Sequence, residues 1–231
     1  MKLPISDRLL ACAGFIAKGD RIADIGCDHG YLSIHALTTG LARSAIAADV
    51  REGPLQSAVY NAIKYGVKDK MECYLSDGVR SIPRDFDTMV CAGMGGDTMV
   101  HILEAAPWLQ NEQYRMILQC QSKTPMLRQY LSDKGWAITE EAVLRDGRFL
   151  YTIMDVCWKP EAPRLSQVEC HFPPALLKNP GVDLPAYYQW VVKVLKIAAE
   201  HQDDAEKKQI LAGLEALAED PALAFLRNES L

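Results

Sequence analysis

Apolar residues recur in two alternating patterns through most of this chain. Short apolar runs are typical of buried strands, and apolar residues spaced three or four positions apart are typical of helices. Strands are predicted at Arg21–Ile25, Ser44–Asp49, Met71–Ser76, Phe86–Ala92, Arg115–Gln121, Trp136–Leu144 and Phe149–Trp158. Helices are predicted at 3–18, Tyr31–Thr39, Pro54–Tyr65, Thr98–Ala105 and Thr124–Lys134. Alternating strands and helices indicate an α/β fold with a parallel sheet.

The last two predicted strands differ, because only the turn Arg145–Arg148 separates them. They should pair as an antiparallel hairpin, so that one strand of a seven-stranded sheet is reversed. Beyond them, Lys159–Pro185 is rich in proline and polar residues, which predicts a linker with little regular structure. Amphipathic helices at Ala186–Ala199 and Ala205–Leu217, with a break near 202–204, predict a helical hairpin.

A glycine-containing loop, Asp24–Gly30, follows the first strand. Ligands of open parallel sheets bind at the carboxyl ends of the strands, where this loop would lie. Its spacing is G-x-D-x-G, which differs from the G-x-G-x-x-G loop of dinucleotide-binding proteins. Asp24 and Asp28 would repel a pyrophosphate but suit a cation, such as the sulfonium and ammonium groups of S-adenosylmethionine. The alternative is a structural turn with incidental acids.

Acids also end the next two strands. Asp49 lies about 20 residues beyond the loop, where a carboxylate commonly accepts hydrogen bonds from ribose hydroxyls. Capping of the following helix is the alternative for Asp49. Asp77, beside Gly78, could accept a hydrogen bond from an adenine amino group. After the fourth strand, Gly93–Gly96 has three glycines in four residues, which implies close approach of the backbone to a ligand.

Composition narrows the class of protein. The chain has 231 residues, 49% of them hydrophobic, and a net charge of −5, so it does not resemble a generic polyanion binder. A nucleic-acid partner would need a local basic surface. We expect no membrane partner, because no run of about 18 apolar residues occurs and Met1–Pro4 lacks a signal-peptide core. Seven cysteines without C-x-x-C spacing argue against a metal site and for a reducing cytoplasm.

Acids after the first three strands of a mostly parallel sheet resemble the class I S-adenosylmethionine-dependent methyltransferase fold. Three further features, Asp24–Tyr31, Ala92–Gly96 and the C-terminal helical hairpin, are together similar to the bacterial tRNA adenine-N1 methyltransferase family of the TrmK type. The resemblance covers essentially the whole chain. It implies a Rossmann-like methyltransferase domain at 1–160, and a linker with a coiled-coil-like α-helical domain at 161–231.

The resemblance also implies a function: transfer of a methyl group from S-adenosyl-L-methionine to N1 of adenosine 22 in tRNA. Cofactor contacts are expected at Asp24, Gly26, Cys27, Asp28, Gly30, Asp49, Asp77, Gly78, Gly93, Met94 and Gly95. The chain departs from the general G-x-G-x-G loop at Asp28, which replaces the middle glycine. Its side chain is free to point at the amino-acid end of the cofactor or at the target base.

The chemistry of the fourth strand end favours a ring nitrogen as the methyl acceptor. Ala92–Gly95 has neither the polar side chain nor the aromatic ring that amino-methylating enzymes carry there. N1 of adenine needs no deprotonation before attack, and a carboxylate could stabilise the positive charge that develops. Asp28 is the first catalytic candidate, and His29 is the second; packing of His29 on the loop is the alternative.

Substrate contacts are expected at Arg8, Tyr31 and Gly96, with Tyr31 as a stacking platform for an extruded base. For Arg8, an ordinary surface charge is the alternative. Rival functions are methylation of another RNA, a small molecule or a protein, and RNA binding without catalysis, which the intact acids disfavour. A nicotinamide oxidoreductase is disfavoured by the loop. We expect a tRNA partner, a monomer and no metal.

Overall fold

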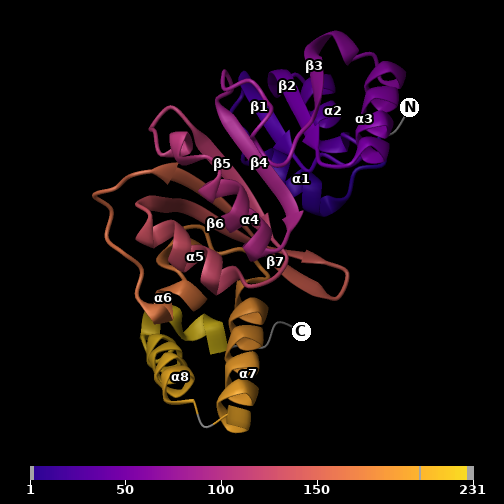
Figure 1. The fold of residues 1–231 in the computed structure, drawn as a ribbon. Helices are drawn as coiled ribbons and strands as arrows, with labels where there is room; N and C mark the ends of the chain where they lie inside the picture. The colour runs from indigo at the N-terminus through magenta and orange to yellow at the C-terminus, as the bar shows by residue number, and fades with distance from the viewer. Residues whose placement is uncertain (1–2, 203, 228–231) are drawn as a thin grey trace.

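The computed structural model describes residues 3–202 and 204–227 and contains one seven-stranded sheet of order β3-β2-β1-β4-β5-β7-β6 (Figure 1). The strands are β1 (Asp20–Ile25), β2 (Ala42–Asp49), β3 (Met71–Leu75), β4 (Thr88–Met94), β5 (Arg115–Cys120), β6 (Trp136–Asp146) and β7 (Phe149–Trp158). The pairs from β3 to β5 are parallel, whereas β7 is antiparallel to both of its neighbours. The predicted sheet with one reversed strand is confirmed.

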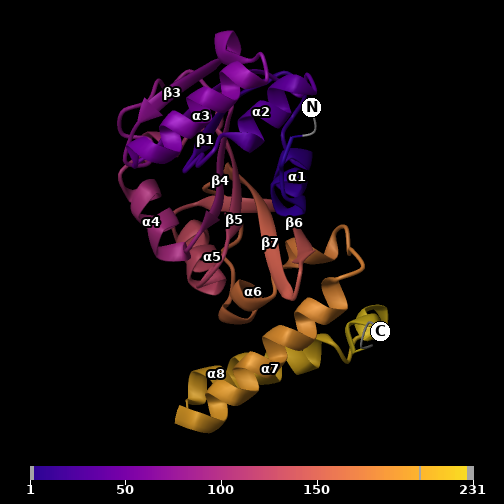
Figure 2. The same cartoon turned by 90° about the vertical axis from the view of Figure 1, so that its right-hand side faces the viewer.

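Helices cover both faces of the sheet. They are α1 (Asp7–Gly14), α2 (Tyr31–Thr38), α3 (Glu52–Lys64), α4 (Gly96–Glu104) and α5 (Thr124–Asp133). Figure 2 shows α1 and α2 on one side of the strands, and α4 and α5 on the other. Successive strand residues alternate between the two cores: Ile22 packs in the α1–α3 core, and Ala23 in the α4–α5 core. Because the strands from β3 to β5 are parallel, their carboxyl ends lie on one edge of the sheet.

Several predicted boundaries shift by one or two residues, and two corrections have a clear physical reason. The fourth strand was expected to end at Ala92 but continues to Met94, because Gly93 adopts a φ of 86° and absorbs a register shift against β5. The first helix is shorter than the expected 3–18. It starts after Ser6, whose hydroxyl accepts a hydrogen bond from the Leu9 amide at 3.3 Å.

The expectation of a structureless linker at Lys159–Pro185 was wrong. The segment contains α6 (Gln167–His171) and a 3-10 helix, η3 (Pro174–Leu177). A capping box starts α6: the Ser166 hydroxyl accepts from the Glu169 amide, and the Glu169 carboxylate accepts from the Ser166 amide. Reading the prolines as loop signals overlooked the buried Phe172 and Leu176 in the same stretch.

The two C-terminal helices form the predicted helical hairpin. They are α7 (Leu184–Gln202) and α8 (Ala205–Leu217), and an unpredicted 3-10 helix, η4 (Pro221–Arg227), follows them. The expected break includes Asp203, which lies outside the described residues. The core between these helices continues onto Val143 and Leu150 of the β6–β7 hairpin. In the part of the chain that the structure describes, no helix is both long and apolar enough to cross a membrane.

One buried guanidinium joins the helical hairpin to the sheet. Arg128 of α5, which is fully buried, donates at 2.6 Å to the buried Glu141 carboxylate of β6. It also donates to the carbonyl oxygens of Cys170 and His171, and to the Tyr187 hydroxyl of α7 at 3.2 Å. Residues beyond 160 thus complete the packing of α5. The division into two domains at 160/161 stays a prediction.

Candidate functional site

The loop after β1 turns through a left-handed backbone. Gly26 and Gly30 both have a φ of 71°, and Asp28 between them has a φ of 49°. Aspartate is one of the few residues with a side chain that enters this region at modest cost. Two successive amides, those of Gly26 and Cys27, donate to the Ala48 carbonyl at 2.8 and 2.9 Å. The loop is thereby held against the end of β2.

Asp49 is the centre of the hydrogen bonds at this edge. Its carboxylate accepts from the Asp28 amide at 3.2 Å and from the Arg51 amide at 2.9 Å, and its own carbonyl accepts from the Ser76 amide at 3.0 Å. Only 4% of Asp49 is exposed. The ends of β1, β2 and β3 are thus tied together. Asp49 does not cap α3, whose N-cap is Arg51 and has no side-chain hydrogen bond to the helix. Asp49 also lines the cleft described next.

Two adjoining cavities form a cleft over the carboxyl ends of the strands. They share Gly26, Asp49, Val50, Met94 and Thr98. One extends to Ile25, Ser76, Asp77, Gly78, His101 and Ile102, and the other to Arg8, Asp28, Arg51, Ala92 and Gly93. The structure therefore brings together most of the residues that the sequence singled out as cofactor contacts.

Close packing at two glycines shapes this cleft. A side chain at Gly26 would overlap the Met94 methyl group, so Met94 lies directly over the loop. A Cβ at Gly93 would be 3.1 Å from a guanidinium nitrogen of Arg8, which donates to the Gln119 side chain at 2.6 Å. Arg8 is therefore held across the turn after β4 by a specific contact, rather than lying as a detached surface charge.

The two acids at opposite ends of the cleft have different surroundings. Asp77 is half-exposed, and its carboxylate lies 3.5 Å from Arg80 and 4.0 Å from the His101 ring nitrogen. The Asp28 carboxylate is more exposed and lies 3.7 Å from the ring nitrogen of His29. Asp28 faces the cavity with Arg8, so the residue in place of the middle glycine does present its carboxylate to the cleft.

His29 and Tyr31 lie in a different groove. They line it with Gly53, Gln56, Ser57, Tyr60 and Asn61 of α3, and the rings of His29 and Tyr31 are 5.7 Å apart. The Asn61 side chain donates to the His29 carbonyl at 3.0 Å. The left-handed turn at Asp28 sends successive side chains in different directions, so the two catalytic candidates do not share one cavity. The expected roles of His29 and Tyr31 stay predictions.

Five other singled-out residues line neither cavity of the cleft. Cys27 is 7% exposed, and burial raises the pKa of its thiol. Gly30 packs against Met71 and Ala58. Gly95 and Gly96 press against the loop after β5, and the Gly96 amide donates to the Ser122 carbonyl at 2.9 Å. The fifth residue, Asp24, is treated below. In these positions the glycines permit close packing between protein segments, and a role in ligand binding stays a prediction.

Sequence reasoning missed several residues of the cleft, among them Thr98, His101 and Val50. Thr98 and His101 lie three positions apart on α4, and this spacing puts them on one face of the helix. Val50 is 63% exposed directly after Asp49. An apolar residue directly after an acid that ends a strand could have signalled Val50. Among the described residues, no group of three or more histidine, cysteine or acidic side chains is placed to hold a metal.

Asp24 lies beneath the loop and is almost fully buried. The Ser33 hydroxyl of α2 donates to its carboxylate at 2.8 Å. Burial raises the pKa of Asp24 to about 6, and the nearby Asp49 adds to the rise. Asp24 does not line the cleft, so its carboxylate could attract a bound cation only from beneath the loop.

Residues 5–154 match a family described as a methyltransferase domain. The tRNA (adenine(22)-N(1))-methyltransferase of Bacillus subtilis is 32% identical over 154 residues, which span 66% of this chain and 65% of that protein. The chain thus spans just under two thirds of this curated relative.

Solved structures match over a longer stretch. Streptococcus pneumoniae Sp1610, assigned as a tRNA (m1A22) methyltransferase and crystallised with S-adenosyl-L-methionine, is 32% identical, with a TM-score of 0.81 over 91% of this chain and 99% of that chain. The Bacillus subtilis m1A22 tRNA methyltransferase TrmK is 26% identical, with a TM-score of 0.78 over 98% of this chain and all of that chain.

Asp24 makes the stability of the cofactor-free protein depend on pH. Because its pKa is about 6 when folded and 3.8 ordinarily, its contribution is full below pH 4 and is lost as pH rises through 6. The loss is roughly 3 kcal/mol. The Asn side chain of Asp24→Asn does not titrate. In urea unfolding from pH 4 to 8, the free energy of unfolding of this variant should therefore rise relative to that of the wild type as pH rises. The titration of the other carboxylates is common to both proteins and cancels in the difference between their free energies of unfolding. A difference that does not change with pH would contradict the prediction.

Proposed function

We propose that this chain, which belongs to the methyltransferase-domain family, transfers a methyl group from S-adenosyl-L-methionine to N1 of adenosine 22 in tRNA. The Bacillus subtilis relative named above is a tRNA (adenine(22)-N(1))-methyltransferase. The family membership rests on a match over 150 residues, from 5 to 154, and the choice of target rests on the site residues considered below.

The cleft suits a cationic nucleoside cofactor. Carboxylates of Asp28, Asp49 and Asp77 line it, and the β1 loop lacks the third glycine of a dinucleotide-binding loop. Asp49 would accept hydrogen bonds from ribose hydroxyls, and the exposed side chain of Val50 would cover one face of the adenine. Asp77 would accept from the adenine amino group, and Asp28 would face the ammonium and sulfonium end. The cofactor supplies the methyl group as an electrophile.

The observation that carries the choice of acceptor is the position of Asp28 beside the apolar end of β4. Asp28, Ala92, Gly93 and Met94 line the same cavity. Ala92, Gly93 and Met94 offer no polar side chain that could hold an exocyclic amine, whereas a ring nitrogen attacks with a lone pair that is already free. Asp28 would stabilise the positive charge that develops on the methylated base. The rest of the catalysis is orientation of the two reactants.

Arg8, held by the buried Gln119, gives the cleft a wall for the substrate side. The Arg8 guanidinium is fixed by Gln119 across Gly93, next to the place where the base would enter. It can bind an anionic oxygen of the RNA there, which offsets locally the net charge of −5. We place this reaction in the cytoplasm, where tRNA is found and where the seven free cysteines stay reduced, and we expect the enzyme to be a monomer.

The function predicts one product at one position. An unmodified tRNA transcript with adenosine at position 22 is incubated with the protein and S-adenosyl-L-methionine, and its nucleosides are analysed by mass spectrometry. We expect 1-methyladenosine, and none in a matched transcript with guanosine at position 22. Methylation of another nucleoside, or equal 1-methyladenosine in both transcripts, would contradict the assignment.

Asp28 should contribute more to the rate than to the fold. Asp28→Gly keeps the left-handed backbone, so it removes the carboxylate alone. We expect a roughly 10²- to 10³-fold fall in the single-turnover rate, the range for loss of one preorganised electrostatic partner. Asp28→Asn also tolerates this backbone and should recover part of the rate. Calorimetry with the cofactor is the control: a rate that returns to normal at saturating cofactor would make Asp28 a binding group only.

A further inference from the structure

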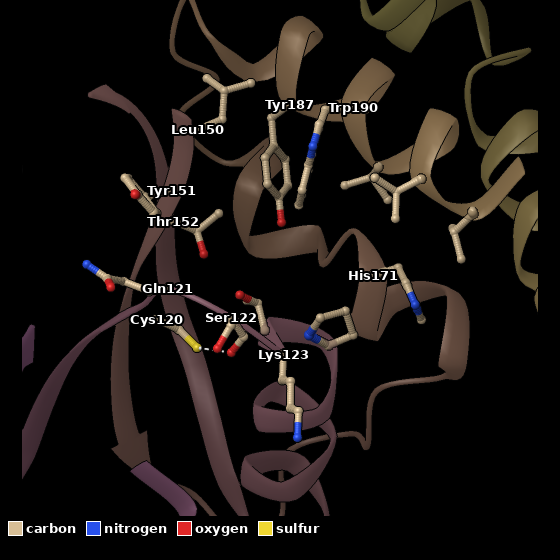
Figure 3. A pocket seen from close by; sticks show the side chains of 15 residues that line it. Cys120, Gln121, Ser122, Lys123, Leu150, Tyr151, Thr152, His171, Tyr187 and Trp190 are labelled. Atoms are coloured by element: carbon tan, nitrogen blue, oxygen red, sulfur yellow. Dashed lines mark hydrogen bonds between the residues drawn. The ribbon is translucent and has the colours of Figure 1, made fainter. Parts of the chain in front are cut away.

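A second cavity lies where the helical hairpin meets the sheet, and we call it the junction cavity. Its volume is about 190 Å³. One wall comes from the β5–α5 loop and the start of β7, and the other from His171 and α7 (Figure 3). Most of the lining is apolar or aromatic, with a few polar groups among them. These are features of a site for a small ring-shaped ligand.

The junction cavity is a neighbour of the cofactor cleft but separate from it. The two have no lining residue in common. The loop 121–123, which lines the junction cavity, is bonded to the chain at the end of β4: the Gln121 amide donates to the Met94 carbonyl at 2.9 Å, and the Ser122 carbonyl accepts from the Gly96 amide at 2.9 Å. A base that receives the methyl group must touch the cleft, so a ligand in the junction cavity would be a different group bound close by.

One buried hydroxyl in the junction cavity lacks a partner. Thr152 of β7 is 2% exposed, and its hydroxyl makes no hydrogen bond to any described residue. Figure 3 shows this hydroxyl on the side of Thr152 that faces Ser122 of the β5–α5 loop, which lines the same cavity. A buried hydroxyl without a partner is unfavourable, and native proteins rarely keep one without a reason. A ligand with a donor or an acceptor on its edge would satisfy it.

Aromatic rings line the opposite wall. Tyr187 and Trp190 of α7 have ring centroids 5.7 Å apart at an angle of 33°, and both line the cavity. The Tyr187 hydroxyl accepts from Arg128, so this ring is fixed, whereas half of Trp190 is exposed at the mouth. A planar ring can enter beside Trp190 and stack on it. Stacking on aromatic side chains is how proteins hold unpaired bases of single-stranded nucleic acids.

Charge and size narrow the ligand further. Lys123, the one lysine in the lining, is paired with Asp97 at 2.6 Å. Burial lowers the pKa of His171, so that its ring is neutral near pH 7. The cavity therefore does not suit a phosphate. It is somewhat larger than the cavity of about 150 Å³ that holds a benzene molecule, which suits one nucleobase.

We propose that the junction cavity receives one unstacked nucleobase of the tRNA, other than the methylated adenosine, between Trp190 and the Thr152 hydroxyl. The inference rests on the proposed function, because that function supplies the RNA. Holding a second base beside the target would fix the extruded strand at two points. It would also explain why α7 lies against the edge of the sheet that carries the site. Trp190 and Thr152 are thus substrate-binding residues.

The test combines protein variants with abasic positions in the RNA. Affinity for a tRNA transcript is measured by fluorescence anisotropy, with S-adenosylhomocysteine present, for the wild type, Trp190→Leu and Thr152→Val. We expect Trp190→Leu to weaken binding roughly 5- to 150-fold, the range for loss of one stacked base. Thr152→Val should weaken it roughly 2- to 10-fold without lowering the melting temperature, because the hydroxyl has no partner to lose. Ile197→Ala, on an exposed part of α7 outside the cavity, is the control and should bind normally.

Transcripts with a single abasic nucleotide, scanned around position 22, then identify the base. At one position other than 22, the abasic transcript should bind the wild type more weakly than the intact transcript does. Trp190→Leu should bind the same abasic transcript and the intact transcript equally well. Three results would overturn the proposal. The affinity losses from Trp190→Leu and from the abasic nucleotide could add at every position, they could fail to add at position 22 alone, or both cavity variants could bind the transcript normally. Methylation by the wild type is measured on the same intact transcript. Methylation with additive losses contradicts only the second base, whereas absence of 1-methyladenosine contradicts the proposed function itself.

Discussion

The carboxylate of Asp49 holds the geometry of the cleft, because it fixes the loop at Asp28, beyond the last backbone bonds between the loop and β2. Backbone pairing aligns β1 with β2 only as far as Ile25 and Ala48. Beyond these residues, the amides of Asp28 and Arg51 converge on one buried carboxylate. Hydrogen bonds to a charged group contribute roughly 1.5–3 kcal/mol each, enough to offset the cost of a left-handed Asp28. The orientation of the Asp28 side chain therefore depends on Asp49.

Arg128 has a comparable role at the junction between the sheet and the helical hairpin. Its partners come from β6, α6 and α7, so one side chain sets the distance between the parts that enclose the junction cavity. The Arg128 Nε atom and one oxygen of Glu141 have no partner among the described residues. Burying such a pair adds little stability, and its value here is a defined geometry. Tyr187 belongs to both the ion-pair network and the cavity wall, which connects the position of α7 to the shape of the cavity.

The periodicity of the chain was sufficient to predict seven strands and the reversal of one of them, because only the turn Arg145–Arg148 separates the last two apolar runs. Acids at strand ends could be predicted to meet, since parallel strands end on one edge. The cavity that each loop side chain faces could not be predicted. His29 and Tyr31 line the groove beside α3 rather than the cleft, although the His29 ring nitrogen lies 3.7 Å from the Asp28 carboxylate. Gly95 and Gly96 matched a ligand-binding turn in sequence, but a protein loop packs on them. The Ser166–Glu169 capping box was readable and was outweighed by the prolines around it.

The central claim, that Asp49 both shapes the cleft and binds the ribose of the cofactor, is tested most directly by calorimetry with S-adenosylhomocysteine. Asp49→Ala is compared with the wild type and with Asp69→Asn, an exposed acid before β3 that serves as the control. The account predicts a folded Asp49→Ala protein whose affinity falls by roughly 1.5–3 kcal/mol or more, while the control binds normally. Equal affinity of folded Asp49→Ala and the wild type would contradict the account.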